Sequence, residues 1–200
     1  MLKFKVLNEE SDLLEFINLY ESAFKSKETT GYKLSLAQLK SRDKVVGVHK
    51  KGQLVGGYTL SNTPNTLIDN ITDKNLARME EHYPLDSCYD LGTIWKKGIS
   101  TLQFTSVVWP RIILDTIFFN LGRSNIVGYV ITGHGRADAY DKASPFYAQS
   151  SPVKHDLNIL VFTRKNLIKA FISGFTKELA RFTIAIFKRP KPSQLSEAKQ

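Results

Sequence analysis

Residues 88–132 constrain the fold of this chain more than any other stretch. An extended apolar segment, Cys88–Trp95, is followed by a helical segment, Pro110–Leu121, and then by a second apolar run, Ile126–Thr132. Short apolar runs on either side of a helix predict two parallel strands joined by a crossover helix. Such a βαβ unit leaves a crevice at the carboxyl ends of its strands, where ligands bind in open sheets. We therefore expect the functional site at that crevice.

The crossover helix of this unit is expected to be mostly buried. It is apolar nearly all round, and Arg111 and Asp115, four residues apart, form its chief polar stripe. Pro110 suits the first helical position, where the missing N–H removes no hydrogen bond. Gly122 ends the helix.

The remaining patterns predict an α+β, or mixed α/β, domain with a central mixed sheet flanked by helices. Val45–His49 and Leu54–Leu60 form the clearest hairpin, and Gly52 supplies the positive φ that its turn requires. The other expected elements are a strand at 2–7, helices at 12–25 and 36–41, an insert at 61–87 with a helix at 73–82, a helix at 137–142, a strand at 157–163 and a helix from 165 to 187. This order divides the chain into a domain at 1–163, a basic amphipathic helix at 164–188 and a polar tail at 189–200, which is expected to be disordered.

Composition indicates a globular protein of the reducing cytoplasm. The chain is 42% hydrophobic and 24% charged, which suffices for a proper core. Cys88 is the single cysteine, so no disulfide can form within the chain. The N-terminus has no signal-peptide apolar core, and no run of about 18 apolar residues predicts a membrane span.

The net charge of +9 is concentrated near the C-terminus. Residues 164–191 hold eight basic residues and one acid, and residues 192–200 are neutral, so the body carries only about +2. A near-neutral body without a basic-aromatic stripe argues against nucleic-acid binding.

The predicted C-terminal helix has an apolar and a basic side. The apolar side comprises Leu167, Phe171, Phe175, Leu179, Phe182 and Ile186. Basic amphipathic helices of this kind lie in membrane interfaces, and residues 165–191 would then attach the protein to an anionic surface, peripheral to the inner face of the membrane. Packing of the same face on the domain, or on a second copy in a homodimer, explains the pattern equally well.

The element order and several residues resemble the GNAT family of acyl-CoA N-acyltransferases. The hairpin with Val55 and Gly56 in its return strand is similar to that of the family, and Tyr140–Phe146 resembles its tyrosine-acid-lysine-x-glycine-phenylalanine signature with one extra residue. The resemblance covers residues 2–163. It implies a GNAT-like fold, a thioester donor (acyl-CoA or acyl carrier protein), a small amine or amino-acid acceptor and no metal.

One family motif is missing. GNAT proteins bind the donor pyrophosphate on a glycine-rich loop before the crossover helix, where main-chain N–H groups approach the phosphates. Here the corresponding loop has Gly98 alone, beside Lys96, Lys97, Ser100 and Thr101, which could bind phosphate through charge and hydroxyls. This loop, which lacks the glycines of the family, is compatible with a divergent relative resembling autoinducer synthases or long-chain N-acyltransferases. It is also compatible with a scaffold that has lost catalysis.

The resemblance also assigns roles. Tyr140 would protonate the leaving thiolate, and main-chain N–H groups around Thr93, Ile94 and Trp95 would polarise the thioester carbonyl. Asp90 is the first candidate for the base, ahead of Glu80, Glu81 and His82 on the insert. The side chains of Tyr140, Asp90 and the three residues of the insert would also be accounted for by an ordinary surface position. The Trp95 side chain would also be accounted for by packing in the core.

Other chemistries have less support in the sequence. The four histidines His49, His82, His134 and His155 are scattered, without the spacing of a metal site. Cys88 lies in a predicted strand and is expected to be a small buried hydrophobe. Two hypotheses remain: an N-acyltransferase, or a catalytically inactive GNAT-like scaffold that binds a membrane surface or a protein.

Overall fold

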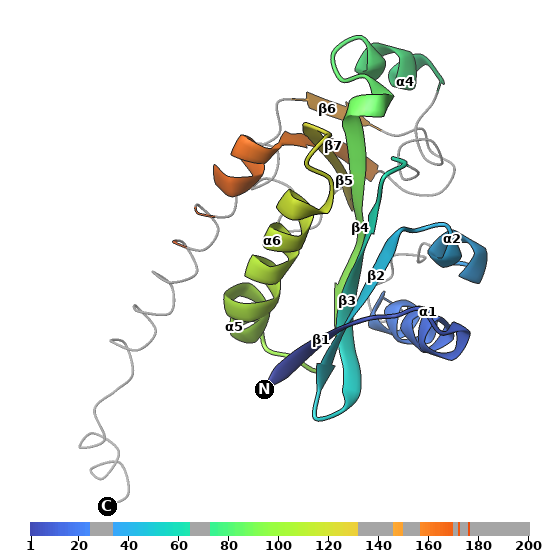
Figure 1. The fold of residues 1–200 in the computed structure, drawn as a ribbon, viewed down its shortest axis with the longest axis vertical. Helices are drawn as coiled ribbons and strands as arrows, with labels where there is room; N and C mark the ends of the chain where they lie inside the picture. The colour runs from blue at the N-terminus through green and yellow to red at the C-terminus, as the bar shows by residue number, and fades with distance from the viewer. Residues whose placement is uncertain are drawn as a thin grey trace, which may run out of the picture.

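The computed structural model describes residues 1–24, 34–64, 73–131, 146–149 and 157–169, with residues 172 and 176. Its centre is a seven-stranded mixed sheet in the order β1-β2-β3-β4-β5-β7-β6 (Figure 1). The strands are β1 (Leu2–Val6), β2 (Lys44–Lys50), β3 (Gln53–Ser61), β4 (Cys88–Lys96), β5 (Asn125–Ile131), β6 (Phe146–Gln149) and β7 (Leu157–Thr163). The predicted mixed sheet is confirmed, while β6 was not predicted.

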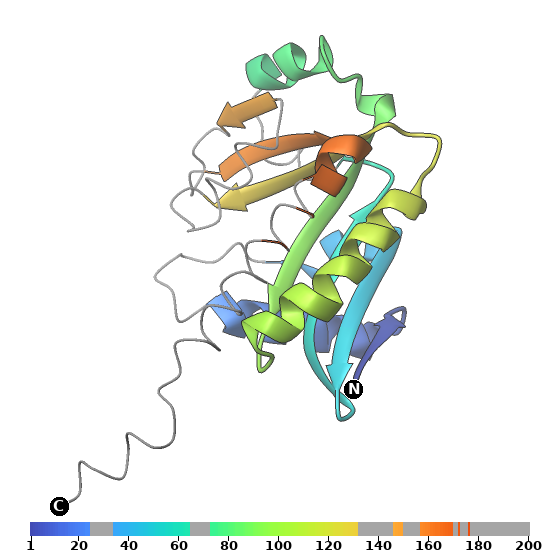
Figure 2. The ribbon, with the colours of Figure 1, turned by 90° about the vertical axis from the view of Figure 1, so that its left-hand side faces the viewer.

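Helices cover both faces of the sheet. The helices α1 (Glu10–Phe24) and α2 (Leu36–Lys40) lie on one face, and α5 (Thr101–Gln103) and α6 (Trp109–Phe119) lie on the other (Figures 1 and 2). The helix α4 (Asp73–Glu80) and the 3-10 turn η1 (Leu85–Ser87) lie at the amino end of β4 (Figure 1). Each face therefore has its own apolar core.

The two cores are built from different residues. Phe16 and Trp95 belong to the core under α1, and their rings meet edge to face at 5.3 Å between centroids. Ile112 and Ile113 belong to the core under α6, with Tyr89. Gly57 lets α1 approach the sheet, because a Cβ on this glycine would lie 2.4 Å from the Phe16 ring.

The predicted hairpin is confirmed. β2 and β3 pair antiparallel up to Lys50 and Gln53. The two turn residues between them have positive φ, 52° at Lys51 and 84° at Gly52. Two successive positive φ values suit the right-handed twist of the flanking strands.

The crossover helix differs from the prediction in its start and in its burial. It begins at Thr101 and runs for 19 residues to Phe119, through a π-helical stretch η2 (Phe104–Val108). The start predicted at Pro110 is wrong: the Trp109 N–H bonds to the Phe104 carbonyl five residues back, and the helix passes Pro110 directly after this wide turn. The expectation of a mostly buried helix is also wrong, because Leu114 and Phe118 are exposed.

Residues 164–169 are helical and continue directly from β7. Leu167 packs into the core under α6, so the first turns of this helix belong to the folded body. The helix predicted at 137–142 lies outside the described residues, as does most of the helix predicted beyond residue 169.

Candidate active site

β4 and β5 part after a short parallel pairing. Their register pairs are Cys88 with Asn125, Tyr89 with Ile126 and Asp90 with Val127. Beyond Asp90, the register partners of β4 lie on β3, and those of β5 lie on β7. Figure 2 shows β5 and β7 turning away from β4. The predicted crevice is therefore a fork whose vertex lies at Asp90 and Val127.

A β-bulge distorts β4 just inside the fork. Gly92 pairs with Thr59 and Trp95 with Gly57, so β4 has one residue more than β3 in this interval. Thr93 lies in the bulge with φ of 51°, a value that a β-branched residue rarely adopts. A bulge re-aims main-chain groups, and here it does so on the strand edge that β5 has left.

The loop that follows β4 turns the chain into the crossover helix. Gly98 takes a positive φ of 76° in this turn. Ser100 caps the helix by accepting a hydrogen bond from the Gln103 N–H at 3.1 Å. The N–H groups of the first helical residues have no intrahelical acceptor and point out of the helix start. This end of the helix faces the loop that the sequence predicts as the phosphate site.

The two lysines of the loop bond to hydroxyl groups. Lys96 Nζ lies 3.0 Å from Thr101 Oγ1 and 5.5 Å from the centroid of the Phe104 ring. Lys97 Nζ lies 2.9 Å from Ser22 Oγ on α1. Lys96 therefore stands at the helix start, where a cation suits an anionic ligand, whereas Lys97 is bonded to α1 on the other face of the sheet.

Other predicted site residues of β4 use their side chains in the core. Trp95 is 3% exposed and packs on Phe16, and its buried indole N–H has no hydrogen-bond partner among the residues that the structure describes. Ile94 is half-buried against the core under α6. Any role of these residues at the fork would fall to their main-chain groups.

Asp90 occupies the vertex of the fork and is buried in an ion pair. Its carboxylate lies 2.9 Å from Arg42 Nη1, and both side chains are at most 5% exposed. Arg42 follows α2, 48 residues earlier in the chain. Asp90 is also the residue at which β4 changes neighbours, since it pairs with both Val127 and Ser61. The ion pair thus braces the vertex, and the role of Asp90 as a base stays a prediction.

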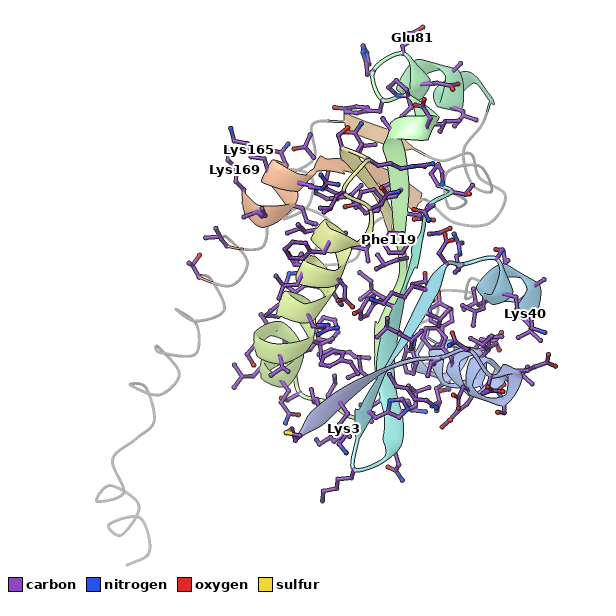
Figure 3. The ribbon with its side chains drawn as sticks, viewed as in Figure 1. Lys3, Lys40, Glu81, Phe119, Lys165 and Lys169 are labelled. Carbon is purple, nitrogen blue, oxygen red and sulfur yellow. The ribbon has the colours of Figure 1, made fainter. Side chains whose placement is uncertain are left out.

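The other candidates are placed less favourably or lie outside the described residues. Tyr140 lies in residues 132–145, which the structure does not describe. Glu80 ends α4, and Glu81 projects from the end of the molecule near the start of β4, away from the loop after Lys96 (Figure 3). Cys88 is buried, as predicted, and burial raises the pKa of its thiol, which disfavours the nucleophilic thiolate.

A polar cluster supports β3 opposite the bulge, and the sequence indicated only its Arg111 and Asp115 members. The Tyr58 hydroxyl donates to Asp115 at 2.5 Å, and Lys44 and Arg111 bond to the same carboxylate at 3.2 and 3.0 Å. Burial opposes the charged form of Asp115, but the hydrogen bonds from Tyr58 and Lys44 and the nearby cations outweigh it and lower the pKa. The cluster ties α6 to the sheet behind the fork.

The comparisons with known proteins bear on the fold. No family model and no curated protein matches the chain. Among solved structures, the AHL synthase LasI is 14% identical over 82% of this chain and 90% of its own, with a TM-score of 0.56. FeeM, an N-acyl amino acid synthase from uncultured soil microbes, is 10% identical over 84% and 93%, with a TM-score of 0.57. A probable acetyltransferase from Staphylococcus epidermidis is 15% identical over 82% and 99%, with a TM-score of 0.53.

The chain has the GNAT fold. The likeness extends through more than four fifths of the chain at identities of 10 to 15%, so the sequence is a divergent one. The resemblance predicted from the hairpin and the βαβ unit is thereby confirmed at the level of fold. The GNAT fold also accounts for the position of the fork between β4 and β5, at the carboxyl ends of the parallel pair.

Proposed function

We propose that the chain is an N-acyltransferase that moves an acyl group from a thioester donor to a small amine or amino-acid acceptor. The observation that carries this proposal is the fork between β4 and β5, with the bulge at Thr93 on its open edge. LasI and FeeM, which share the fold, are synthases of acylated products by their names. They support acyl transfer as the reaction class.

The donor would lie with its anionic end at the start of the crossover helix. Lys96 supplies charge there, with Lys97 next to it in the loop, and Ser100 and Thr101 supply hydroxyls beside the N–H groups of the first turn. These groups replace the glycines of the family loop with side-chain contacts. The donor is acyl-CoA or an acyl carrier protein thioester, both of which carry phosphate near the thiol arm.

In the proposed reaction, the neutral amine attacks the thioester carbonyl carbon, the carbonyl oxygen takes up negative charge, and the C–S bond breaks as the amide forms. Main-chain N–H groups around Thr93 stabilise the oxyanion. Asp90, which is ion-paired with Arg42, is proposed to take the proton that the acceptor ammonium loses before attack. Tyr140 is proposed to protonate the departing thiolate, and the proton that the attacking nitrogen loses as the amide forms restores the Tyr140 hydroxyl.

The test of the proposal begins with binding. Isothermal titration with acetyl-, octanoyl- and palmitoyl-CoA and with palmitoyl-acyl carrier protein should give a saturable signal for at least one donor. If no donor binds, the acyltransferase proposal fails. With a donor in hand, Tyr140→Phe should lower turnover at least about tenfold, because a positioned acid contributes that much or more. An unchanged rate would remove Tyr140 from the mechanism.

A second candidate is a GNAT-like scaffold without catalysis. The single glycine of the phosphate loop and the ion pair that buries Asp90 favour this alternative. It predicts binding to a membrane or protein without thioester turnover, which the donor titration and a free-thiol assay separate from the first proposal.

A further inference from the structure

The outer side of the crossover helix carries an apolar stripe. Its members are spaced by seven and four residues and are 44%, 52% and 66% exposed: Val107, Leu114 and Phe118. Leu121, which is 65% exposed, lies in the turn just past the end of the helix. The opposite side of the same helix, with Ile112 and Thr116, is buried against the sheet. The stripe therefore faces directly away from the domain core, where large apolar side chains indicate an interaction site.

A second pair of exposed apolar residues begins near the carboxyl end of α6. Ile168 and Ile172 are four residues apart and 40% and 54% exposed. The base of their helix is fixed, because Arg164 Nη2 donates to the carbonyls of Asn120 and Arg123 directly after α6. We call the stripe and this pair together the outer α6 surface.

Charge around the outer α6 surface is of one sign. Asp115 is the sole acid between residues 91 and 131, and it is bound to Lys44, Arg111 and Tyr58. Residues 157–176 contain no acid. In Figure 3, Lys165 and Lys169 project on the side of the molecule where α6 lies, opposite Lys40. The apolar residues are thus flanked by cations, with no exposed acid among these residues.

We propose that the outer α6 surface lies in the headgroup region of an anionic membrane. Apolar side chains enter the boundary of the acyl chains while the exposed Lys165 and Lys169 bind lipid phosphates, as in other interfacial helices. A second copy is a poorer partner, because a two-fold contact through this surface would bring like charges together. The helix is long and apolar enough to cross a membrane, but its inner side is built into the domain core, so it lies on the membrane instead.

On this proposal, α6 contributes to membrane binding in addition to residues 165–191. Vesicle flotation separates the contribution of α6 from that of the C-terminal residues. The full chain is floated with vesicles of phosphatidylcholine plus phosphatidylglycerol, and with vesicles of phosphatidylcholine alone. Leu114→Ser/Phe118→Ser should weaken partitioning to the anionic vesicles at least about tenfold, because two large apolar groups leave the interface. The matched control is Leu14→Ser/Val6→Ser, which changes two residues of 44% exposure on other elements and should bind as the parent does.

The charge requirement has its own pair of variants. Lys165→Glu/Lys169→Glu should weaken binding to the anionic vesicles by about tenfold or more, while Lys3→Glu/Lys51→Glu should not. Because all substituted residues are exposed, circular dichroism should show every variant folded.

Three outcomes would overturn the proposal. The first is that the parent chain does not float with anionic vesicles, or floats equally well with phosphatidylcholine alone. The second is that Leu114→Ser/Phe118→Ser binds as tightly as the parent, which would leave attachment to the C-terminal residues alone. The third is that light scattering shows a dimer that Leu114→Ser/Phe118→Ser dissociates, with no vesicle binding, which would assign the surface to a second copy.

Discussion

The two halves of β4 are built for different purposes. The amino half, up to Asp90, pairs with β5, and Arg123 donates to its Cys88 carbonyl at 2.5 Å. The carboxyl half, from Leu91 to Lys96, takes its register partners from β3 and has lost β5 as a neighbour. One half is fixed between the two arms of the sheet, and the other has register partners on β3 alone among the described residues. The strand changes roles at a single residue, Asp90.

Removal of Arg42 should have the largest effect on stability, because Arg42 binds Asp90, the residue at which β4 changes neighbours. Arg42→Ala leaves the Asp90 carboxylate buried without its cation and should lower the free energy of unfolding by about 3–5 kcal/mol. Urea denaturation measures this loss. Arg42→Ala/Asp90→Asn should recover a part of it, since no buried charge remains. A loss below about 1 kcal/mol for the single variant would mean that the ion pair does not brace the vertex.

A smaller loss of stability is expected at Asp115, whose cluster supports β3 beside the carboxyl half of β4. Asp115→Asn should cost about 1–3 kcal/mol at neutral pH, because Tyr58 and Lys44 lose a charged acceptor. The pKa of Asp115 is lowered in the folded state, so its contribution is fully present above the ordinary value of 3.8 and is lost as pH falls below it. The parent and the variant should therefore converge in stability in strong acid. The exposed Asp86→Asn serves as the control, and an Asp115→Asn loss that is the same at all pH values would contradict the assignment.

A smaller effect, of opposite sign, is expected at the bulge. Thr93→Gly removes the strain of a positive φ but adds chain entropy to the unfolded state, so we expect a net gain of about 0.5–1 kcal/mol. For a chain of this size that is a rise of about 1–4 °C in Tm, measured by calorimetry. Thr59→Gly, on the facing strand β3, should instead lower Tm. A fall in Tm for Thr93→Gly would show that the threonine side chain stabilises the bulge.

The smallest effect on stability is expected at the end of the carboxyl half of β4. Lys96→Ala/Lys97→Ala should change the free energy of unfolding by less than about 0.5 kcal/mol, because the hydroxyl bonds of both ammonium groups lie near the surface. Donor affinity should nevertheless fall at least about tenfold in titration calorimetry, with a weaker dependence on salt. Lys3→Ala/Lys51→Ala is the matched control. Unchanged donor affinity would exclude this loop as the phosphate site.

The sequence predicted the elements that depend on local patterns. The hairpin followed from alternation and Gly52, and the strands at 88 and 126 followed from apolar runs on either side of a helix. The fork was predicted as a crevice because parallel strands need a crossover between them. These features depend on residues close together in the chain.

The features that the sequence did not predict depend on distant partners or on competing local signals. Arg42 lies 48 residues before Asp90, and no pattern near either residue indicates the pair. Pro110 indicated a helix start, but the π-helical turn before it accommodates a residue without an N–H. The apolar composition of α6 indicated burial on all sides, whereas only the side toward the sheet is covered.

The three register pairs between β4 and β5 have a mechanical consequence. They are the only ladder that joins strands β1 to β4 with strands β5 to β7 among the described residues, so resistance to bending of the sheet is least there. A change of angle at this joint would break no pair within either arm, but it would disturb the core under α6, which contains Val48 of one arm and Phe162 of the other. The angle between the two arms then depends on the contacts at this joint. Arg42 binds Asp90 on one side, and Arg123 binds the Cys88 carbonyl on the other. Under the proposed acyl transfer, a longer acyl chain is expected to require a wider angle between the two arms at this joint.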